Sequence, residues 1–112
     1  MNRSTKDKQQ IEQWCEALES GKYQQIKYFL QDEKGYCCLG VACELFGENL
    51  VKNEHNKLKG STPFDQESRG AKLPDWLLEI NTSYAFVLSY MNDVEKMSFK
   101  EIAKVIREEV LQ

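Results

Sequence analysis

The chain has 112 residues, four cysteines, a net charge of −3 and an isoelectric point near 5.2. These values predict one domain, residues 1–112, with a single modest core. They disfavour a nucleic-acid polymer as the main partner, because phosphate binding requires a surplus of Lys and Arg on some face. Without a signal peptide or an apolar run of ~20 residues, we expect a cytoplasmic protein with reduced thiols and no membrane span.

The first predicted helix covers residues 6–19, with Ser4 or Thr5 as its N-cap and Gly21 at its end. Its apolar residues recur at spacings of three and four, so they share one face of the helix. They are Ile11, Trp14, Cys15 and Leu18. We interpret Trp14 as a core anchor rather than a ligand platform, because large aromatics at helical spacing usually pack inward.

An apolar stretch at residues 35–47 joins a predicted strand to a predicted helix. Residues 28–30 and 36–38 favour β structure, and the polar residues between them are typical of a tight turn. We therefore expect these two segments to pair as antiparallel strands. From Leu39 the apolar period becomes helical, and the helix is expected to end at Gly47 in the left-handed conformation.

Two glycines of this stretch have specific predicted roles. Gly35 is expected to take the left-handed conformation that closes the turn before the second strand. Gly40, in the first helical turn, has two interpretations: close packing that leaves no room for a side chain, or a backbone left open for an anion. The lack of a surrounding glycine-rich loop favours close packing.

The middle of the chain is weakly patterned. Residues 48–60 predict an irregular hairpin around residues 53–56, and the polar residues 60–72 predict a mobile loop. His55 is the sole histidine of the chain. Because it lies in this polar part, we expect it at the surface rather than as a ligand or a base.

Further helices are predicted toward the C-terminus. Pro74 opens a short helix that ends at Asn81. The apolar residues 84–90 fit either a strand or a short helix, which residues 91–93 are expected to break.

The last helix is predicted over residues 99–111. Ser98 and Glu101 have the spacing of a capping box at its start. Its expected buried residues are Phe99, Ile102, Ala103, Ile106 and Val110. Together, the elements predict an α+β fold: a small single domain in which N- and C-terminal helices pack on a short antiparallel sheet.

No catalytic or metal-binding pattern stands out. Cys37, Cys38 and Cys43 lack the paired spacings of zinc sites, and a cysteine nucleophile would have only His55 as its base. There is no Walker, Rossmann or metal-loop motif. We therefore expect a binding protein with no cofactor and no metal rather than an enzyme.

Several segments together resemble a widespread group of small, uncharacterised tailed-phage proteins. They are Trp14-x-x-Ala17-Leu18-x-Ser20-Gly21-x-Tyr23-x-Gln25, Gly35-Tyr36-Cys37-Cys38-Leu39-Gly40-Val41-x-Cys43-x-Leu45, Leu73-Pro74, and Asn92-Asp93 with Ser98-Phe99-x-x-Ile102-Ala103-x-x-Ile106. The Cys-Cys-Leu-Gly-Val core is the most specific of them. The chain differs from the group at Ile26 and Tyr28, where small glycines are frequent.

The resemblance implies a phage accessory protein that acts by binding inside an infected bacterial cell. We expect a homo-oligomer that sequesters, without cleaving, a nucleotide-derived immune signal of the cyclic ADP-ribose type. Aromatic side chains would stack on the base, and Lys or backbone N–H groups would hold the phosphates. The expected ligand-binding residues, which match the group and are not required by the predicted core, are Lys22, Tyr23, Gln25, Tyr36, Asn92 and Asp93.

Two other functions remain open. One is an inhibitor that covers the active site of a host protein with an acidic face, and a small molecule bound to the purified protein would argue against it. The other is a metal- or thiol-dependent enzyme. Zinc in the purified protein, or activity lost when Cys37 or Cys38 is alkylated, would support that enzyme.

Overall fold

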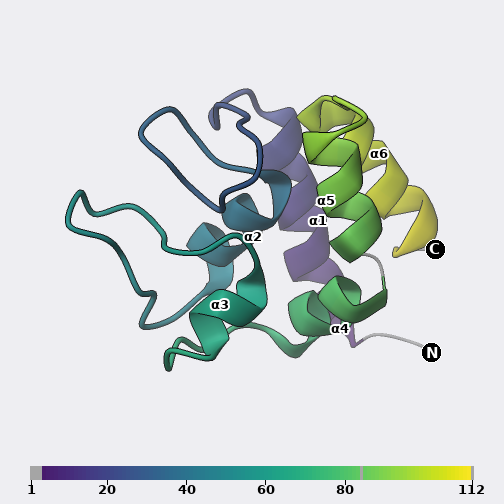
Figure 1. Ribbon diagram of the computed structural model, residues 1–112. Coiled ribbons are helices and arrows are strands. Elements are labelled where there is room, and N and C mark those ends of the chain that lie inside the picture. The colour runs from purple at the N-terminus through teal and green to yellow at the C-terminus, as the bar shows by residue number, and fades with distance from the viewer. Residues whose placement is uncertain (1–3, 84, 112) are drawn as a thin grey trace.

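The computed structural model describes residues 4–83 and 85–111, with side chains described outside residues 81–86. Helices joined by irregular segments make up the described chain (Figure 1). They are α1 (Thr5–Glu19), α2 (Cys38–Phe46), α3 (Pro63–Glu67), α4 (Asp75–Ser83), α5 (Ala85–Asp93) and α6 (Phe99–Glu109). The structure is 52% helical, with 7% in strands or bridges and no sheet among the described residues. The predicted α+β fold is therefore wrong, and the fold is helical.

The two strands predicted on either side of the polar turn pair only at one antiparallel bridge, between Gln31 and Tyr36. Tyr28 has a φ of +74°, which an extended strand does not allow. Cys38 already begins α2. The two segments are therefore too short in extended conformation to form a ladder of paired residues. The turn between them is present.

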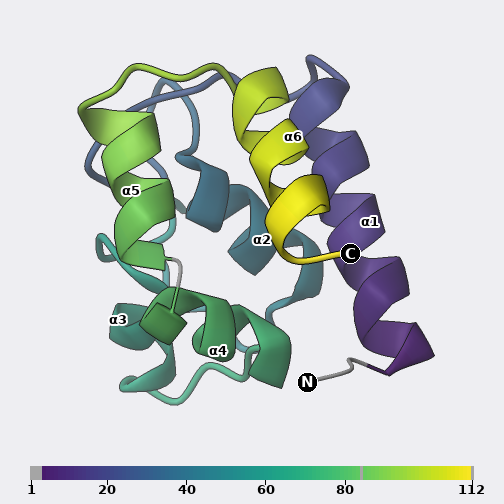
Figure 2. The ribbon, with the colours of Figure 1, turned by 90° about the vertical axis from the view of Figure 1, so that its right-hand side faces the viewer.

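Helix α1 begins as predicted, because the Ser4 hydroxyl accepts a hydrogen bond from the Asp7 backbone N–H at 3.1 Å. Helix α6 packs along it (Figure 2). Arg107 of α6 joins the two helices, since its guanidinium pairs with the carboxylates of Glu12 and, at 2.8 Å, Glu19 on α1. The N- and C-terminal helices thus form one side of the molecule.

Helix α2 lies at the centre, between α1 and α5 (Figure 2), and its residues 38–43 are all buried. Trp14 and Trp76 pack beside it with ring centroids 5.6 Å apart. The indole Nε1 of Trp14 donates to the carbonyl oxygen of Cys38 at 2.9 Å. The predicted role of Trp14 as a core anchor is confirmed.

Two glycines allow backbones to approach closely. A Cβ built on Gly40 would lie 1.8 Å from the carbonyl oxygen of Leu30, so the close-packing interpretation of Gly40 holds. A Cβ on Gly35 would lie 2.0 Å from the carbonyl oxygen of Gln24. Gly35 and Gly47 do not adopt the left-handed conformation predicted for them; Gly47 has a φ of −80°.

The irregular hairpin predicted at residues 48–60 is confirmed by an antiparallel bridge between Lys52 and Leu58. The loop predicted at residues 60–72 is wrong in part, because Pro63 opens the short helix α3 within it. The helix that follows Pro74 runs two residues beyond its predicted end, to Ser83.

The C-terminal part is helical as far as it is described. The segment predicted at residues 84–90 belongs to α5 from Ala85 onward, and its residue 84 lies outside the described residues. The expected break at residues 91–93 is wrong, since α5 continues to Asp93. The capping box of Ser98 and Glu101 is confirmed at the start of α6. No described helix combines the length and the apolar character needed to cross a membrane.

Candidate functional site

Five of the six predicted site residues meet at one place, where the segment after α1 contacts the C-terminal end of α5. We call this set, Tyr23, Gln25, Tyr36, Asn92 and Asp93, the anchor cluster. The rings of Tyr23 and Tyr36 pack edge to face with centroids 5.3 Å apart, and Gln25 forms a parallel bridge with Tyr36. The sixth predicted residue, Lys22, is exposed, and no hydrogen bond joins its side chain to the described residues of the cluster.

Asn92 is the centre of the anchor cluster and is 1% exposed. Its Oδ1 accepts from Gln25 Nε2 at 2.9 Å, and its Nδ2 donates to the carbonyl oxygen of Ile26 at 2.7 Å. Gln25 Nε2 also donates to the carbonyl oxygen of Met97 at 2.8 Å. A buried amide requires such partners. The expectation that the fold does not need these polar groups is therefore wrong for Gln25 and Asn92.

Asp93 extends the anchor cluster to the backbone of Tyr28. Its Oδ1 accepts from the Tyr28 N–H at 3.0 Å and from Asn92 Nδ2 at 2.7 Å. Tyr28 is held there with its positive φ, a conformation that costs a non-glycine residue about 1 to 2 kcal/mol. The anchor cluster thus fixes residues 26–35, which we call the 26–35 loop, to α5.

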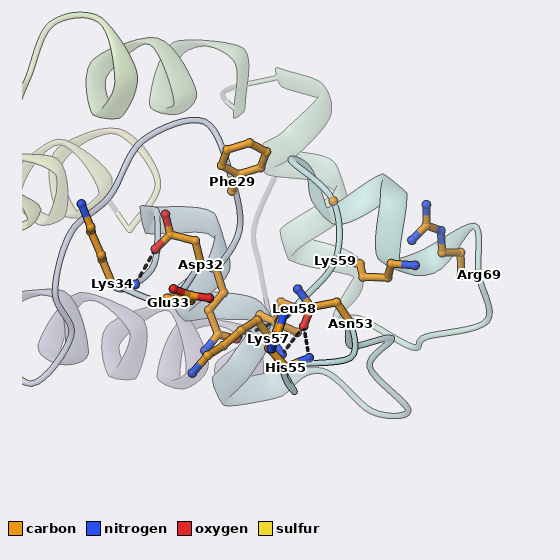
Figure 3. A pocket seen from close by; sticks show the side chains of 12 residues that line it. Phe29, Asp32, Glu33, Lys34, Asn53, His55, Lys57, Leu58, Lys59 and Arg69 are labelled. Carbon is orange, nitrogen blue, oxygen red and sulfur yellow. Dashed lines mark hydrogen bonds between the residues drawn. The ribbon is translucent and has the colours of Figure 1, made fainter.

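The 26–35 loop forms one wall of a cleft of about 540 Å³, which we call the basic cleft (Figure 3). The hairpin of residues 51–60 forms the other wall, and Arg69 reaches it from beyond α3. The lining residues are Phe29, Gln31, Asp32, Glu33, Lys34, Asn53, His55, Lys57, Leu58, Lys59, Gly60 and Arg69. None of the six predicted site residues is among them.

Hydrogen bonds join the two walls at the floor of the basic cleft. The backbone N–H of Leu30 donates to the carbonyl oxygen of Gly60 at 3.1 Å, and that of Leu58 donates to Gln31 Oε1 at 2.9 Å. Leu30 and Leu58 are both buried. The floor at Leu58, which is in the lining, is therefore apolar and is tied to the 26–35 loop, whereas Leu30 packs into the core next to it.

Gln66 of α3 fixes the hairpin in place and is fully buried. Its Oε1 accepts from the Val51 N–H, and its Nε2 donates to the carbonyl oxygens of Val51 and Lys59, each at 2.8 Å. One side chain thereby satisfies backbone groups on both arms of the hairpin. This arrangement sets the position of Lys59 in the basic cleft.

The lining of the basic cleft is rich in cations. Lys34, Lys57, Lys59 and Arg69 form no ion pair with a described carboxylate. The lining has only two carboxylates, although the chain as a whole has a net charge of −3. His55 is exposed, as predicted, and its Nε2 lies 3.6 Å from a carboxylate oxygen of Glu54. The arrangement favours an anionic ligand.

Phe29 is the aromatic residue of the lining, and its side chain is 54% exposed. It follows Tyr28, whose left-handed backbone is fixed by Asp93. Figure 3 shows the Phe29 ring at the end of the loop wall, above the floor. An exposed ring held on a fixed backbone can stack against the flat face of a ligand.

The cysteines take no part in the basic cleft. All four are buried and free, with no disulfide between them. Burial raises the pKa of the Cys15 thiol to about 12 and that of Cys37 to about 11, and it raises the pKa values of Cys38 and Cys43 as well. The described residues also contain no group of three or more His, Cys, Asp or Glu side chains that could hold a metal. The geometry gives no support to the thiol-dependent or metal-dependent enzyme.

The family model for DUF8296, a domain of unknown function, matches residues 5–81. The chain belongs to the DUF8296 family. The matched part of this DUF8296 protein contains the whole lining of the basic cleft, whereas Asn92 and Asp93 lie beyond it. No curated protein and no solved structure matches the chain.

Sequence reasoning missed the lining residues, including Phe29, Lys59 and Arg69. One signal was available, because Lys57, Leu58 and Lys59 alternate as in a strand. That alternation turns Leu58 into the core and leaves both lysines on the cleft side. The position of Arg69 depends on α3, which the polar composition of residues 60–72 did not reveal.

Proposed function

We propose that this DUF8296 protein binds a nucleotide-derived immune signal of the cyclic ADP-ribose type in the basic cleft and sequesters it without cleavage. The observation that carries the proposal is the cluster of four cations around an open cleft in an acidic chain, none of which pairs with a carboxylate of the described residues. Like charges gathered on one surface repel one another, and a bound anion reverses that cost. The cleft volume of about 540 Å³ falls within the usual range for small-molecule sites.

The lining offers one partner for each part of a nucleotide. Lys57, Lys59 and Arg69 supply positive donors for phosphate oxygens, and a guanidinium can bind two of them at once. Phe29 supplies an exposed ring for stacking against a base. The predicted residues of the anchor cluster contribute indirectly, because they fix the loop from which Phe29 projects.

The biological setting comes from the resemblance to small tailed-phage proteins. A phage protein that binds a host immune signal lowers its free concentration in the cytoplasm of the infected cell. This role requires tight binding and many copies of the protein. The homo-oligomer that we also propose comes from the same resemblance. Size-exclusion chromatography with light scattering measures the oligomeric state directly.

Binding of a host protein is the second candidate function. The observation that favours it is a stripe of exposed apolar side chains, Val87 and Tyr90 on α5 and Val94 in the turn directly after it. Their spacing of three and four places them on one face of the helix. Exposed apolar groups that share a face are typical of protein contacts. This surface lies outside the basic cleft, so the two functions are separable by mutation.

A thermal-shift panel tests the proposal. The purified protein is heated with ADP-ribose, cyclic ADP-ribose, ADP and inorganic pyrophosphate, and a ligand at 100 times its Kd adds about 2.7 kcal/mol of stability. We expect Lys59→Ala and Phe29→Ala each to reduce the shift clearly. Lys104→Ala and Phe64→Ala, which remove similarly exposed side chains outside the cleft, should keep it.

The chemical state of the ligand separates sequestration from catalysis. The bound compound is released by heat and analysed by mass spectrometry, and we expect it to be intact. A panel without any shift would contradict the proposal and would favour a host protein as the partner. Hydrolysed ligand would contradict sequestration and would indicate an enzyme.

A further inference from the structure

The two charged ends of the basic cleft differ in chemistry. Figure 3 shows the cations Lys59 and Arg69 at one end, and both carboxylates of the lining, Asp32 and Glu33, at the other end beside Lys34. A site built for anions alone gains nothing from carboxylates, because they repel the same charges that the cations attract. Carboxylates in such a site can contribute to binding when the ligand also carries hydrogen-bond donors, because they accept hydrogen bonds from them.

The two carboxylates have different tasks within the turn of the 26–35 loop. Asp32 Oδ1 accepts from the backbone N–H groups of Lys34, at 2.6 Å, and Gly35, at 3.2 Å, so it shapes the turn around Glu33. The Glu33 carboxylate accepts no hydrogen bond from the described residues. An ionised carboxylate is an acceptor only, and it binds hydroxyl groups strongly.

We infer that Glu33 is a specificity-determining residue that accepts hydrogen bonds from the ribose hydroxyls of a nucleotide whose phosphates lie at Lys59 and Arg69. This inference rests on the proposed function. It adds recognition of the ribose, which the phosphate-binding end at Lys59 and Arg69 does not contact. The cleft therefore selects a ribonucleotide over the same nucleotide without its 2′-hydroxyl. Inorganic phosphate or pyrophosphate occupies only the end formed by Lys59 and Arg69.

Calorimetric titration with ADP and 2′-deoxy-ADP tests the inference, because the two probes carry the same charge. We expect the protein to bind ADP about tenfold more tightly, the usual effect of one hydrogen bond to a charged group. Glu33→Ala should bring the two Kd values within about twofold of each other. Glu33→Gln, which keeps a neutral acceptor, should show an intermediate ratio.

Two further variants make the ratio of the Kd values decisive. Lys59→Ala should raise the Kd values of ADP and 2′-deoxy-ADP by similar factors, so the ratio of the two Kd values should stay unchanged. Glu108→Ala removes an exposed carboxylate on α6, outside the cleft, and should change neither Kd. If both probes bind and Glu33→Ala keeps the tenfold ratio, the inference is overturned while the proposed function stands. If neither probe binds at millimolar concentration, the inference is overturned, and the proposed function is overturned with it when ADP-ribose and cyclic ADP-ribose also fail to bind.

Discussion

The carbonyl oxygen of Leu30 occupies the space in which a side chain at position 40 would begin, because a Cβ built on Gly40 would lie 1.8 Å from it. Leu30 belongs to the 26–35 loop, and Gly40 belongs to the first turn of the central helix α2. This contact seats the loop directly on the core. The loop that forms one wall of the basic cleft is therefore seated through backbone atoms, which cannot move aside as a flexible side chain can.

Substitution of Gly40 by Ala should be strongly destabilising. The added methyl group meets a backbone carbonyl, so we expect a loss of about 3 kcal/mol, at the upper end of the usual cost of overpacking. Urea unfolding followed by circular dichroism measures it. Gly70→Ala is the matched control, because position 70 has a φ of +99° and no atom within 4 Å of an added Cβ. The control should lose only about 1 kcal/mol from backbone strain, and equal losses would contradict this account.

Removal of the Asn92 side chain should release the 26–35 loop. Asn92→Ala leaves the Ile26 carbonyl oxygen without its amide partner and deprives Gln25 of one acceptor. Buried groups left unsatisfied cost about 1 to 3 kcal/mol each, so the unfolding free energy should fall by about 2 to 3 kcal/mol. Gln13→Ala, an exposed change on α1, should cost less than about 0.5 kcal/mol. Equal stability of the two variants would show that the anchor cluster is not structural.

Tyr28→Gly should stabilise the protein. Glycine adopts the φ of +74° without the steric penalty that a Tyr side chain incurs. After the greater chain entropy of glycine is subtracted, the expected gain is about 0.5 kcal/mol. Tyr28→Ala removes the same ring but keeps the strain, so it should show no gain. Thermal unfolding of the two variants makes the comparison, and a stabilised Ala variant would contradict the explanation.

The stability of the protein should depend on Asp65 in acid. Hydrogen bonds from the backbone N–H groups of Ser61 and Thr62 hold the pKa of this carboxyl below its ordinary value. Because the folded pKa lies below the unfolded one, the stabilisation is complete above about pH 4 and is lost as the pH falls through the folded value. Asp65→Asn should flatten the decline of unfolding free energy between about pH 4 and pH 2. Parallel curves for the two proteins would exclude this contribution.

The four thiols should resist modification while the protein is folded. Burial raises their pKa values, so little thiolate is present at pH 8. A chromogenic disulfide reagent should therefore react with none of them within minutes, and with four per chain in guanidinium chloride. Rapid reaction of one thiol in the native protein would reopen the possibility of a cysteine-dependent activity.

The sequence was sufficient for the elements with one clear apolar face. Helices α1 and α6 were predicted because their apolar residues recur at helical spacing behind a recognisable N-cap. The sheet was predicted in part from the aromatic residues Tyr28 and Phe29, because aromatic residues favour strands wherever they can pack. Tyr28 and Phe29 are instead exposed, and the backbone of Tyr28 is set by a carboxylate 65 residues away. The pattern of residues within a short segment cannot predict a contact with a residue so distant in the sequence.

The candidate site could not be predicted from the local sequence either. The predicted residues Gln25 and Asn92 are brought together, but by hydrogen bonds that serve the fold. The lining residues come from three separate parts of the chain and meet only because Gln66 and Asn92 fix the hairpin and the loop. Neither amide was distinguishable from a solvated polar residue in the sequence, since burial alone gives each of them its role.

Buried Gln66 supplies both a donor and an acceptor to the hairpin, as the edge of a neighbouring strand would do. The side chains of Phe29, Glu33, Lys59 and Arg69 also line the basic cleft, but they form no hydrogen bond with the backbone of the described residues. The amides that support the cleft and the exposed side chains that give it its shape and charge thereby stand at different positions of one short chain. Exchange of Phe29, Glu33, Lys59 or Arg69 for other residues leaves the supporting amides untouched, so the shape and charge of the cleft can change without loss of a described hydrogen bond that holds its walls.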